Sequence, residues 1–544
     1  MSIYDKSSLV LIPSGTKTGK VFSQKPVSGD GDFTFTRASA ATRVNADGLI
    51  EKGRENVLRK SNQPNTHTIN LSTYSGNQAD PFGGNTAWAW RETATTGQHY
   101  GITNNNQVLG VGVWTFSVYV KPVNKTSVYF TWNSPNASNY GNVSFSFNSK
   151  TFTTSNVIAA GYEELTNGWF RLYYAINVSG AGSHNVYYNT LSTYTGDVNN
   201  GFDFTRFQIE RGLVATDYIE TDENPVEAGI TDNVPRLDYT DSSCPALLLE
   251  PQRTNLIPNS EYFGSWSDAL GCDIYTNTET SPEGVYNAAT ISFGSSGDSR
   301  AFVSASNSSA TYIFSVYAKS STSKKFRFRI SGSGGTQYSD DLTTTSEWQR
   351  FEFEYTGDVT AVGITNASTA DGGSIFVYGF QQEAGSYATS YIPTYGSSVS
   401  RGQDICFITN LKNNVTTGAT QGSVMIDFTR DGFHSTGDAI QVYGDTSNGR
   451  GYVYNTGIGF ASNWGLGTHN ISYGTDYKVL YRLNTLSTGN IFLNGSKSAE
   501  ASGSSWGSIN AIYLRGNHGT LKIRQVLVST TALTDQEAID LTTI

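Results

Sequence analysis

Two long stretches of this chain resemble each other, and this repetition restricts the possible folds more than any other feature. Glu51, together with an arginine, an asparagine and a serine that follow it, recurs 199 residues later around Glu250. Three further matches follow in the same order along the chain, and their offsets shrink to 173. Because equal motifs in equal order indicate a duplicated unit, the sequence predicts two tandem domains of one fold. The matches are Glu51, Arg54, Asn56 and Ser61 with Glu250, Arg253, Asn255 and Ser260; 114–121 with 312–319; 169–173 with 348–352; and 207–219 with 380–392.

Within each unit, short segments alternate between apolar and polar residues. Residues 114–121 read Trp-Thr-Phe-Ser-Val-Tyr-Val-Lys, which places Trp, Phe and two Val on one face of a strand. Residues 312–319, 326–330 and 351–355 show the same period of two. The chain has 56 glycines and only 2 methionines among 544 residues, so turn formers are plentiful and strong helix formers are scarce. An all-β fold of antiparallel sandwiches of the jelly-roll kind is therefore expected.

This reasoning divides the chain into four parts. Residues 32–225 and 226–400 are predicted to form jelly-roll domains 1 and 2, the second being a repeat of the first. Residues 401–544 do not repeat again but are equally rich in strand patterns, which predicts a third β-sandwich. Residues 1–31 are rich in Gly, Ser, Lys and Thr, and they are expected to be an N-terminal connecting or docking segment.

Charge and composition disfavour several classes of protein. Lys and Arg number 36 against 46 Asp and Glu, and the resulting net charge of −10 disfavours nucleic-acid binding, which needs cations for the phosphates. No segment approaches the roughly 18 apolar residues of a membrane helix, and the start lacks a signal-peptide pattern. A protein made soluble in a cytoplasm is expected, with neither membrane nor nucleic acid as partner. Cys244, Cys272 and Cys406 are too scattered for a disulfide framework and are expected to be free thiols.

Catalytic and metal-binding patterns are weak. Residues 15–21 superficially suggest a phosphate-binding loop, but its spacing is short and a valine stands where Ser or Thr is needed. The six histidines are scattered and form no metal-binding cluster. Asp340, Asp341, Asp438 and Asp445 are candidates for a glycosidase pair, which requires a separation that sequence spacing cannot show. We therefore expect no catalytic residue, no metal and no cofactor.

Several phrases of the chain resemble known families. Residues 380–394, Phe-Gln-Gln-Glu-Ala-Gly-Ser-Tyr-Ala-Thr-Ser-Tyr-Ile-Pro-Thr, and the opening phrase at 33–51 resemble phrases of tailed-bacteriophage fibre, spike and head-fibre proteins. The two units between these phrases are similar to carbohydrate-binding-module-like jelly rolls. Residues 490–495, Asn-Ile-Phe-Leu-Asn-Gly, and residues 521–541 resemble a laminin-G or concanavalin-type lectin domain. The resemblance implies that lectin-like fold for the third sandwich.

The resemblance also implies a function. It implies a non-enzymatic structural component of a bacteriophage virion, in a head or tail fibre or spike, that attaches to host surface glycans. Its partners would be a host surface polysaccharide and other virion proteins, the latter contacted through residues 1–31, and fibres of this kind favour a homotrimer. Two alternatives stay open: a purely architectural capsid decoration protein and a polysaccharide depolymerase.

Aromatic side chains in Gly- and Asn-rich segments are candidates for sugar binding. An exposed ring stacks on the apolar face of a pyranose, while neighbouring polar side chains bind its hydroxyls. The candidate glycan-binding residues are Trp464, Trp506, Trp88, Trp90 and Trp132.

The repeated charged residues are expected to stabilise the fold. Arg54 follows Glu51, and Arg253 follows Glu250, so each pair is expected to form a half-buried ion pair at the start of its unit. The recurrence of both pairs beside otherwise different loops favours this structural role.

Overall fold

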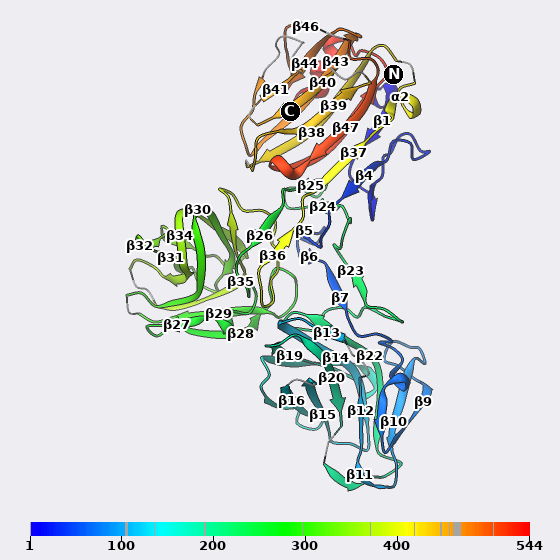
Figure 1. Cartoon of the computed structure of the whole chain (residues 1–544), viewed down its shortest axis with the longest axis vertical. Coiled ribbons are helices and arrows are strands. Elements are labelled where there is room, and N and C mark those ends of the chain that lie inside the picture. Colours follow the sequence, from blue (N-terminus) through cyan, green and yellow to red (C-terminus); the bar gives the residue numbers. More distant parts are fainter. Residues whose placement is uncertain are drawn as a thin grey trace.

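The chain folds into three β-sandwiches arranged around a central junction, as Figure 1 shows. The all-β prediction is confirmed. The structure is a computed structural model, which describes residues 2–544 except 104–106, 135–136, 190–191, 296, 370–371, 418, 433, 446–448, 456, 461–468 and 504, and no side chains at 107, 134 and 137–140.

The first jelly roll lies at the bottom of Figure 1 and consists of two facing antiparallel sheets. Aromatic and β-branched residues from both sheets fill the space between them. One sheet has the order β18 (Ala159–Glu164), β19 (Phe170–Val178), β14 (Gly112–Val123), β22 (Gly201–Arg211), β10 (Ala87–Glu92), β9 (Ser72–Gln78). The other has the order β17 (Thr151–Ser155), β16 (Ala137–Ser146), β15 (Ser127–Ser134), β20 (Gly182–Tyr188), β12 (Tyr100–Ile102), β8 (Thr68–Asn70), with β13 (Gln107–Leu109) also on β20 and a separate pair β11 (Thr96–Gln98) and β21 (Thr193–Thr195).

The second jelly roll is built from one continuous antiparallel sheet that folds over its own core. Two very long strands, β30 (Arg300–Lys319) and β34 (Gln349–Asn366), pair along most of their lengths, and bulges interrupt their register between Ser304 and Ala310. The order is β28 (Asp273–Glu279), β29 (Ala288–Phe293), β35 (Gly373–Ala384), β30, β34, β31 (Lys325–Gly332), β32 (Gly335–Tyr338), with β27 (Ser267–Ala269) on β30 and β33 (Leu342–Thr343) on β31.

The predicted duplication is visible in the strand pairing of the two jelly rolls. Strand β14 pairs with β19 and β22, and β30 pairs in the same way with β34 and β35. Even a register shift is repeated, between Ser117 and Tyr119 in the first copy and between Ser315 and Tyr317 in the second. The matched sequence segments therefore occupy equivalent strands.

The repeated asparagines explain part of this equivalence. Asn56 donates to the carbonyl oxygens of Phe207 and Ile219, and its own oxygen accepts from two backbone N–H groups. Asn255 makes the equivalent four bonds with the second copy's backbone. Both side chains are fully buried, so they satisfy backbone groups that would otherwise lose their partners on leaving water. The interpretation of the repeated residues as fold determinants is thereby supported at this position.

The third sandwich is assembled from three separate parts of the chain. Its strands come from residues 7–36, 236–249 and 405–529. One sheet has the order β24 (Arg236–Asp238), β25 (Ala246–Leu249), β48 (Thr520–Ser529), β38 (Gly422–Asp431), β43 (Thr475–Thr485), β44 (Thr488–Leu493), β45 (Ser496–Lys497), with β1 (Ser7–Leu11) also on β48 and β46 (Ala501–Ser502) on β44. The other has the order β2 (Thr16–Lys17), β3 (Lys20–Val21), β4 (Phe33–Thr36), β37 (Ile405–Ile408), β47 (Ile509–Arg515), β39 (Asp438–Gly444), β40 (Arg450–Tyr454), β41 (Gly457–Phe460), β42 (His469–Asn470).

This assembly corrects the predicted boundaries. Residues 1–31 are not a separate segment, because β1, β2 and β3 belong to the sheets of the third sandwich. The physical reason lies in the apolar islands of the segment: Leu9, Leu11 and Val21 are fully buried in the core of that sandwich. The domain boundary at 400–401 likewise misses residues 236–249, which pair with β48.

Short ribbons between the three sandwiches form a hub, defined here as residues 40–56, 226–255 and 399–404. A hairpin of β5 (Thr42–Val44) and β6 (Ile50–Lys52) lies at its centre. The first and last strands of each jelly roll pair beside it, β7 (Arg54–Asn56) with β23 (Val226–Ala228), and β26 (Arg253–Asn255) with β36 (Val399–Arg401).

The Thr-x-x-Glu spacing of Thr534 and Glu537 is typical of the start of a helix, and these two residues form a capping box at the start of α3 (Asp535–Thr542). Within the part of the chain that the structure describes, no helix is long and apolar enough to cross a membrane. The remaining helical turns are α1 (Ile3–Lys6), α2 (Leu411–Asn414), η1 (Pro64–Thr66), η2 (Thr166–Gly168), η3 (Phe263–Ser265) and η4 (Gly516–His518).

We expect Leu11→Ala to destabilise the third sandwich by about 2–5 kcal/mol, because it empties a buried site in the core. Denaturant unfolding of the full chain measures this change. Ile12→Ala is the matched control, since Ile12 is 45% exposed, and it should change the free energy of unfolding by less than about 0.5 kcal/mol. Equal effects of the two substitutions would show that β1 is not part of the core.

Candidate functional site

Most of the tryptophans proposed for sugar binding lie in the cores instead. Trp90 and Trp132 are 0% exposed in the first jelly roll, and Trp506 is 1% exposed against Phe460 in the third sandwich. These three candidates were wrong, because a buried ring cannot stack on a sugar: strand alternation turns Trp90 and Trp132 inward, and Trp506 enters the core from the segment between β46 and β47. Trp88 is half-buried at the edge of β10, where its ring covers Gly76. Trp464 lies outside the described residues.

The two predicted ion pairs are also wrong, because both glutamates pair with other arginines. Glu51 pairs with Arg43 across the β5–β6 hairpin at 2.7 Å, and not with Arg54. Glu250 pairs with Arg236 at 2.5 Å and with Arg401 at 2.8 Å. Cross-strand neighbours, which sequence spacing does not reveal, thus replace the predicted local partners.

Arg253 is bound elsewhere. It donates to Nδ1 of His434 at 2.6 Å and lies over the ring of Tyr387, so it joins the start of the second jelly roll to the third sandwich. Arg54 has no ion pair among the described residues and lines two cavities of the hub.

A buried charge network joins the hub to the third sandwich. Asp404 accepts from Arg37 at 3.1 Å, from Arg236 and from the backbone N–H of Glu250 at 2.8 Å. Glu250 shares Arg236 with Asp404 and also binds Arg401. All five side chains are at most 3% exposed.

Burial alone would raise the pKa of Glu250, but Arg401, Arg236 and the donors of Ser390 outweigh it and hold that pKa well below its usual range. The carboxylate is therefore charged at neutral pH. This network sets how the modules meet at the hub.

The face of the third sandwich that carries β37, β47, β39 and β40 presents a row of aromatic side chains to solvent. Cross-strand pairing aligns Phe407 with Tyr513, Tyr513 with Gln441, and Gln441 with Tyr452. The rings of Phe407 and Tyr513 are stacked, with centroids 5.5 Å apart and planes 13° apart. Tyr443 meets Tyr513 edge to face at 5.7 Å. All four aromatic side chains are half-buried, and we call them, with the polar residues between them, the aromatic face.

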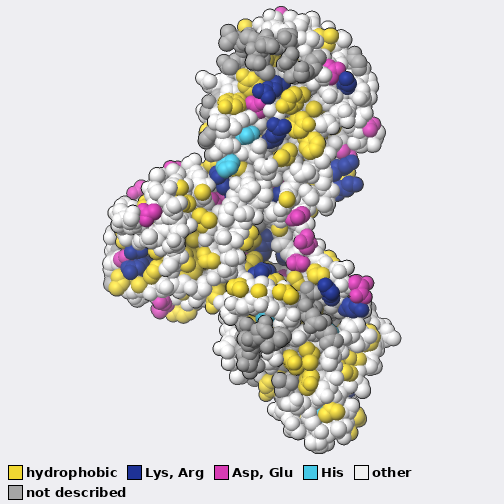
Figure 2. Space-filling view, in the orientation of Figure 1, with side chains coloured by type: hydrophobic (Ala, Val, Ile, Leu, Met, Phe, Trp, Pro, Cys, Tyr) yellow, Lys and Arg dark blue, Asp and Glu magenta, His cyan; other side chains and the backbone are white. Residues whose placement is uncertain are grey.

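Polar groups lie between these rings. Tyr443 donates to Gln441 at 2.8 Å, Gln441 donates to Asp438 at 2.7 Å, and Arg450 pairs with Asp438 at 3.2 Å. The guanidinium of Arg515 lies over the ring of Tyr513 at 4.7 Å. On this face of the molecule, Figure 2 shows hydrophobic side chains gathered together with basic and acidic ones. The arrangement offers flat apolar rings beside fixed donors and acceptors.

Gly459 explains how Tyr452 lies on this face. A Cβ at Gly459 would be 2.7 Å from the hydroxyl oxygen of Tyr452, so the ring needs the space that glycine leaves. Because the two residues are cross-strand partners, the glycine lets the ring lie down on the neighbouring strand.

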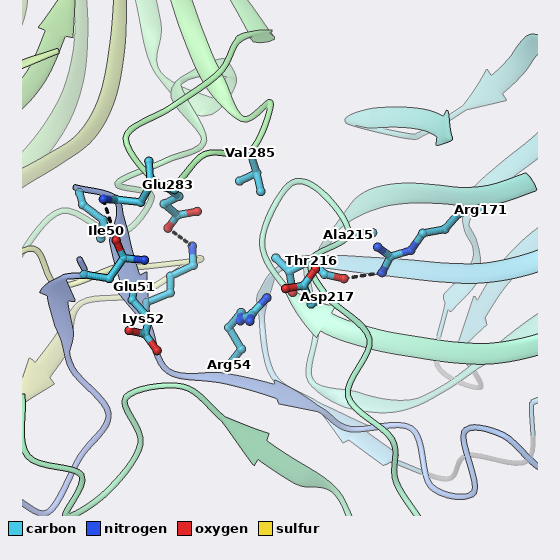
Figure 3. A pocket seen from close by; sticks show the side chains of 12 residues that line it. Ile50, Glu51, Lys52, Arg54, Arg171, Ala215, Thr216, Asp217, Glu283 and Val285 are labelled. Carbon is cyan, nitrogen blue, oxygen red and sulfur yellow. Dashed lines mark hydrogen bonds and ion pairs between the residues drawn. The ribbon is translucent and has the colours of Figure 1, made fainter. Parts of the chain in front are cut away.

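A second candidate region is a cavity of about 250 Å³ in the hub, seen in Figure 3. The β5–β6 hairpin and Glu283 of the second jelly roll border it on one side, and the turn at 215–217 of the first jelly roll borders it on the other. Lys52 pairs with Glu283 at 2.5 Å and Glu261 at 3.0 Å, and these two carboxylates hold the pKa of Lys52 above its usual value even though burial opposes this.

Three of the carboxylates considered for glycoside hydrolysis have partners of other kinds. Asp438 belongs to the aromatic face, Asp445 pairs with Lys412 at 3.1 Å, and Asp341 binds the N–H and hydroxyl of Ser368 in the second jelly roll. Asp340 follows β32 in that same jelly roll. Among the described residues, no three His, Cys, Asp or Glu side chains are grouped in a way that could hold a metal ion. Cys244, Cys272 and Cys406 are free, as expected.

Sequence reasoning missed the aromatic face because its rings are spread over strands far apart in the chain. Each strand carries only one or two of these rings, within an ordinary alternation of buried and half-buried residues such as that of Ile405–Ile408. The available signal was an aromatic residue at the polar phase of each strand, as at Phe407 and Tyr513.

No protein-family model matches the chain, and no curated protein matches it. The chain is similar to the tandem CBM22-1–CBM22-2 domain of Paenibacillus barcinonensis Xyn10C, with 12% identity over 61% of this chain and 96% of that one, at a TM-score of 0.22. It is similar to the CBM40 of the Ruminococcus gnavus IT-sialidase bound to α2,3-sialyllactose, with 16% identity over 25% of this chain and 91% of that one, at 0.19.

A third similar structure is the botulinum neurotoxin serotype D binding domain, with 13% identity, 25% of this chain and a TM-score of 0.22. The match spans 39% of that domain. These similar structures are carbohydrate-binding modules and neurotoxin binding domains, and at these TM-scores they carry no argument about what this chain binds.

We expect Glu250→Gln to lower the free energy of unfolding by about 3–5 kcal/mol at pH 7, because it removes the carboxylate that pairs with buried Arg401 and leaves Arg236 with Asp404 alone. The folded-state pKa of Glu250 is depressed, so its stabilisation is present above the unfolded pKa, about 4.3, and is lost as the pH falls below it. Denaturant unfolding between pH 7 and pH 3 should therefore show a smaller pH dependence in the variant. Glu223→Gln is the control, since its side chain is 70% exposed, and it should leave the pH dependence unchanged.

Proposed function

We propose that this chain is a carbohydrate-binding protein and that the aromatic face of the third sandwich contacts the glycan. The observation that carries this proposal is the cross-strand row of Phe407, Tyr513 and Tyr452 with Gln441 between them. Adjacent strands lie about 4.8 Å apart, so the row provides successive contact points along an extended ligand.

The chemistry of the face suits a polysaccharide. Tyrosine rings present apolar surface to the C–H groups of a pyranose and keep a hydroxyl for hydrogen bonding. Asp438 accepts hydrogen bonds, while Arg450 and Arg515 donate them, so hydroxyl groups find both kinds of partner. Since the rings are already held by stacking and by hydrogen bonds to Gln441, little side-chain freedom is lost on binding.

We further propose that the protein acts on a bacteriophage virion, as a component of a head or tail fibre or spike that attaches to the host surface. Support for this finer assignment comes from the resemblance of residues 33–51 and 380–394 to phage appendage proteins. The segment 12–29, which contains β2 and β3, offers a contact for other virion proteins, since Ile12, Phe22 and Val27 are 45%, 37% and 96% exposed there.

A binding role is proposed in preference to a catalytic one. The depolymerase alternative predicts that the pure protein shortens host polysaccharide, which size-exclusion chromatography of the treated polymer measures. The capsid-decoration alternative predicts that loss of the protein lowers particle stability without changing adsorption. Deletion of residues 401–544 is unsuitable for these tests, because it removes most strands of both sheets that also hold residues 7–36.

We expect Tyr513→Ala to weaken glycan binding about fivefold per site, since one ring contact contributes about 1 kcal/mol. Binding of the full chain to host surface polysaccharide, measured by biolayer interferometry, tests this. Tyr275→Ala is the matched control, because Tyr275 is a tyrosine 53% exposed on the second jelly roll, and it should bind as wild type does. If both variants bind alike, the aromatic face is not the glycan site.

The virion assignment predicts that antibodies to the third sandwich label phage particles in negative-stain microscopy at heads or tails. Particles without label would contradict it. The homotrimer stays a prediction, and light scattering of the purified 58.9 kDa chain tests it, a stable monomer being the contrary result.

A further inference from the structure

The hub cavity of Figure 3 has an equivalent in the second copy of the repeat. The second cavity, of about 350 Å³, shares five equivalent lining residues with the first, and the rest of its lining differs. The repeat therefore supplies an internal comparison, in which the same frame surrounds two cavities with different chemistry. The corresponding residues are Glu51 and Glu250, Arg171 and Arg350, Ala215 and Ala388, Thr216 and Thr389, Asp217 and Ser390.

The two equivalent arginines are held differently. Both lie over a tyrosine ring, Arg171 over Tyr119 and Arg350 over Tyr317. Arg350 then turns back to donate to Ser315 at 2.9 Å. In the first copy the equivalent serine, Ser117, has no partner for its hydroxyl in the described part of the chain, because the arginine turns toward the cavity instead.

Arg171 is left with unused donor capacity. One terminal nitrogen donates to the carbonyl oxygen of Thr216. Its Nε, like that of Arg350, is buried without a hydrogen-bond partner in the described part of the chain, and the residue is only 9% exposed. A buried donor without an acceptor costs free energy, roughly 1–3 kcal/mol, unless a ligand or water supplies the acceptor.

The repeated glutamate has different partners in the two copies. Ser390 donates to Glu250 through its N–H at 2.7 Å and through its hydroxyl at 2.6 Å, which joins the hub to the second jelly roll. Asp217 stands at the position of Ser390 and has no side-chain proton to donate. Glu51 binds Arg43 instead, so the first copy lacks the equivalent hydrogen bonds between the hub and its jelly roll.

Of the charged side chains that line the first cavity, three have no ion-pair partner among the described residues. Glu51 is paired with Arg43, and Lys52 is paired with Glu283. Arg54 and Asp217 have no ion pair among the described residues, and Arg171 has none either. Two guanidinium groups and one carboxylate are thus left, and Figure 3 shows Arg54 and Arg171 approaching the turn that carries Asp217 from different directions.

We infer that this cavity binds one acidic sugar unit, with its carboxylate between Arg54 and Arg171 and a ring hydroxyl donating to Asp217. Guanidinium groups bind the two oxygens of a carboxylate in a fixed fork geometry, which fits the two unused cations. The carboxylate of Asp217 can accept a hydrogen bond from a sugar hydroxyl that lies beside the bound anion. The volume of about 250 Å³ lies just below the usual range of small-ligand pockets, so it suits a single ring and not a chain. This site does not depend on the aromatic face.

Calorimetric titration of the full chain with glucuronate, glucose and inorganic phosphate tests the inference. Glucuronate should bind, and glucose, which lacks the carboxylate, should bind at least about tenfold more weakly. Equal binding of glucose would overturn the assignment. Phosphate binding as tight as glucuronate would also overturn it, because the site would then be a general oxyanion site.

Two substitutions locate the site. Arg54→Gln should weaken glucuronate binding about tenfold or more, since it removes one charged hydrogen-bonding partner from the carboxylate. Arg350→Gln is the matched control for Arg171→Gln, because Arg350 is the equivalent residue in the second copy. It should leave glucuronate binding unchanged. Arg171 is largely buried, so the Arg171→Gln variant is used only if its thermal unfolding matches that of the wild type. If the variant is destabilised, Arg54→Gln alone provides the test.

Tyr513→Ala separates this site from the proposed glycan face. It should leave glucuronate affinity unchanged while it weakens polysaccharide binding. Loss of glucuronate binding in Tyr513→Ala with retention in Arg54→Gln would place the acidic sugar on the aromatic face and refute the cavity site.

Discussion

The buried pairing of Asp404 and Glu250 with Arg37, Arg236 and Arg401 is the interaction on which the modular arrangement depends. These five residues come from the ends of strands that lead into different modules, so one network fixes the points at which the chain passes from one module to the next. Buried charges tolerate few geometries, because each loss of a partner leaves a charge without compensation. The hub is therefore defined by directional bonds, whereas each sandwich is defined by its apolar core.

Much of the fold was predictable from the sequence, because its signals are local or repeated. Alternation identified strands such as residues 114–121, matching motifs in the same order identified the duplication, and a capping box identified the final helix. The role of residues 1–31 was not predictable, since a strand pattern as short as Leu9–Leu11 does not say which distant strand it pairs with. Register and partner choice are decided by tertiary packing, which sequence alone does not display.

The candidate sites were less predictable than the fold. A tryptophan next to Gly or Asn has no periodic signal that distinguishes a core ring from an exposed one, and Trp90, Trp132 and Trp506 all fill cores. The aromatic face and the hub cavity exist only where distant strands meet. In the cavity, the informative signal was a difference between the repeats, Asp217 against Ser390, which becomes meaningful once both are placed in space.

The pairing of β1 with β48 has a consequence for biosynthesis. Strand β1 can find its neighbour only after Thr520–Ser529 has been made, so the third sandwich is completed after both jelly rolls. Both jelly rolls are insertions within that sandwich and can fold earlier from their own contiguous residues. Until then β1 stays an unpaired apolar strand, and a truncated translation product would expose it to aggregation.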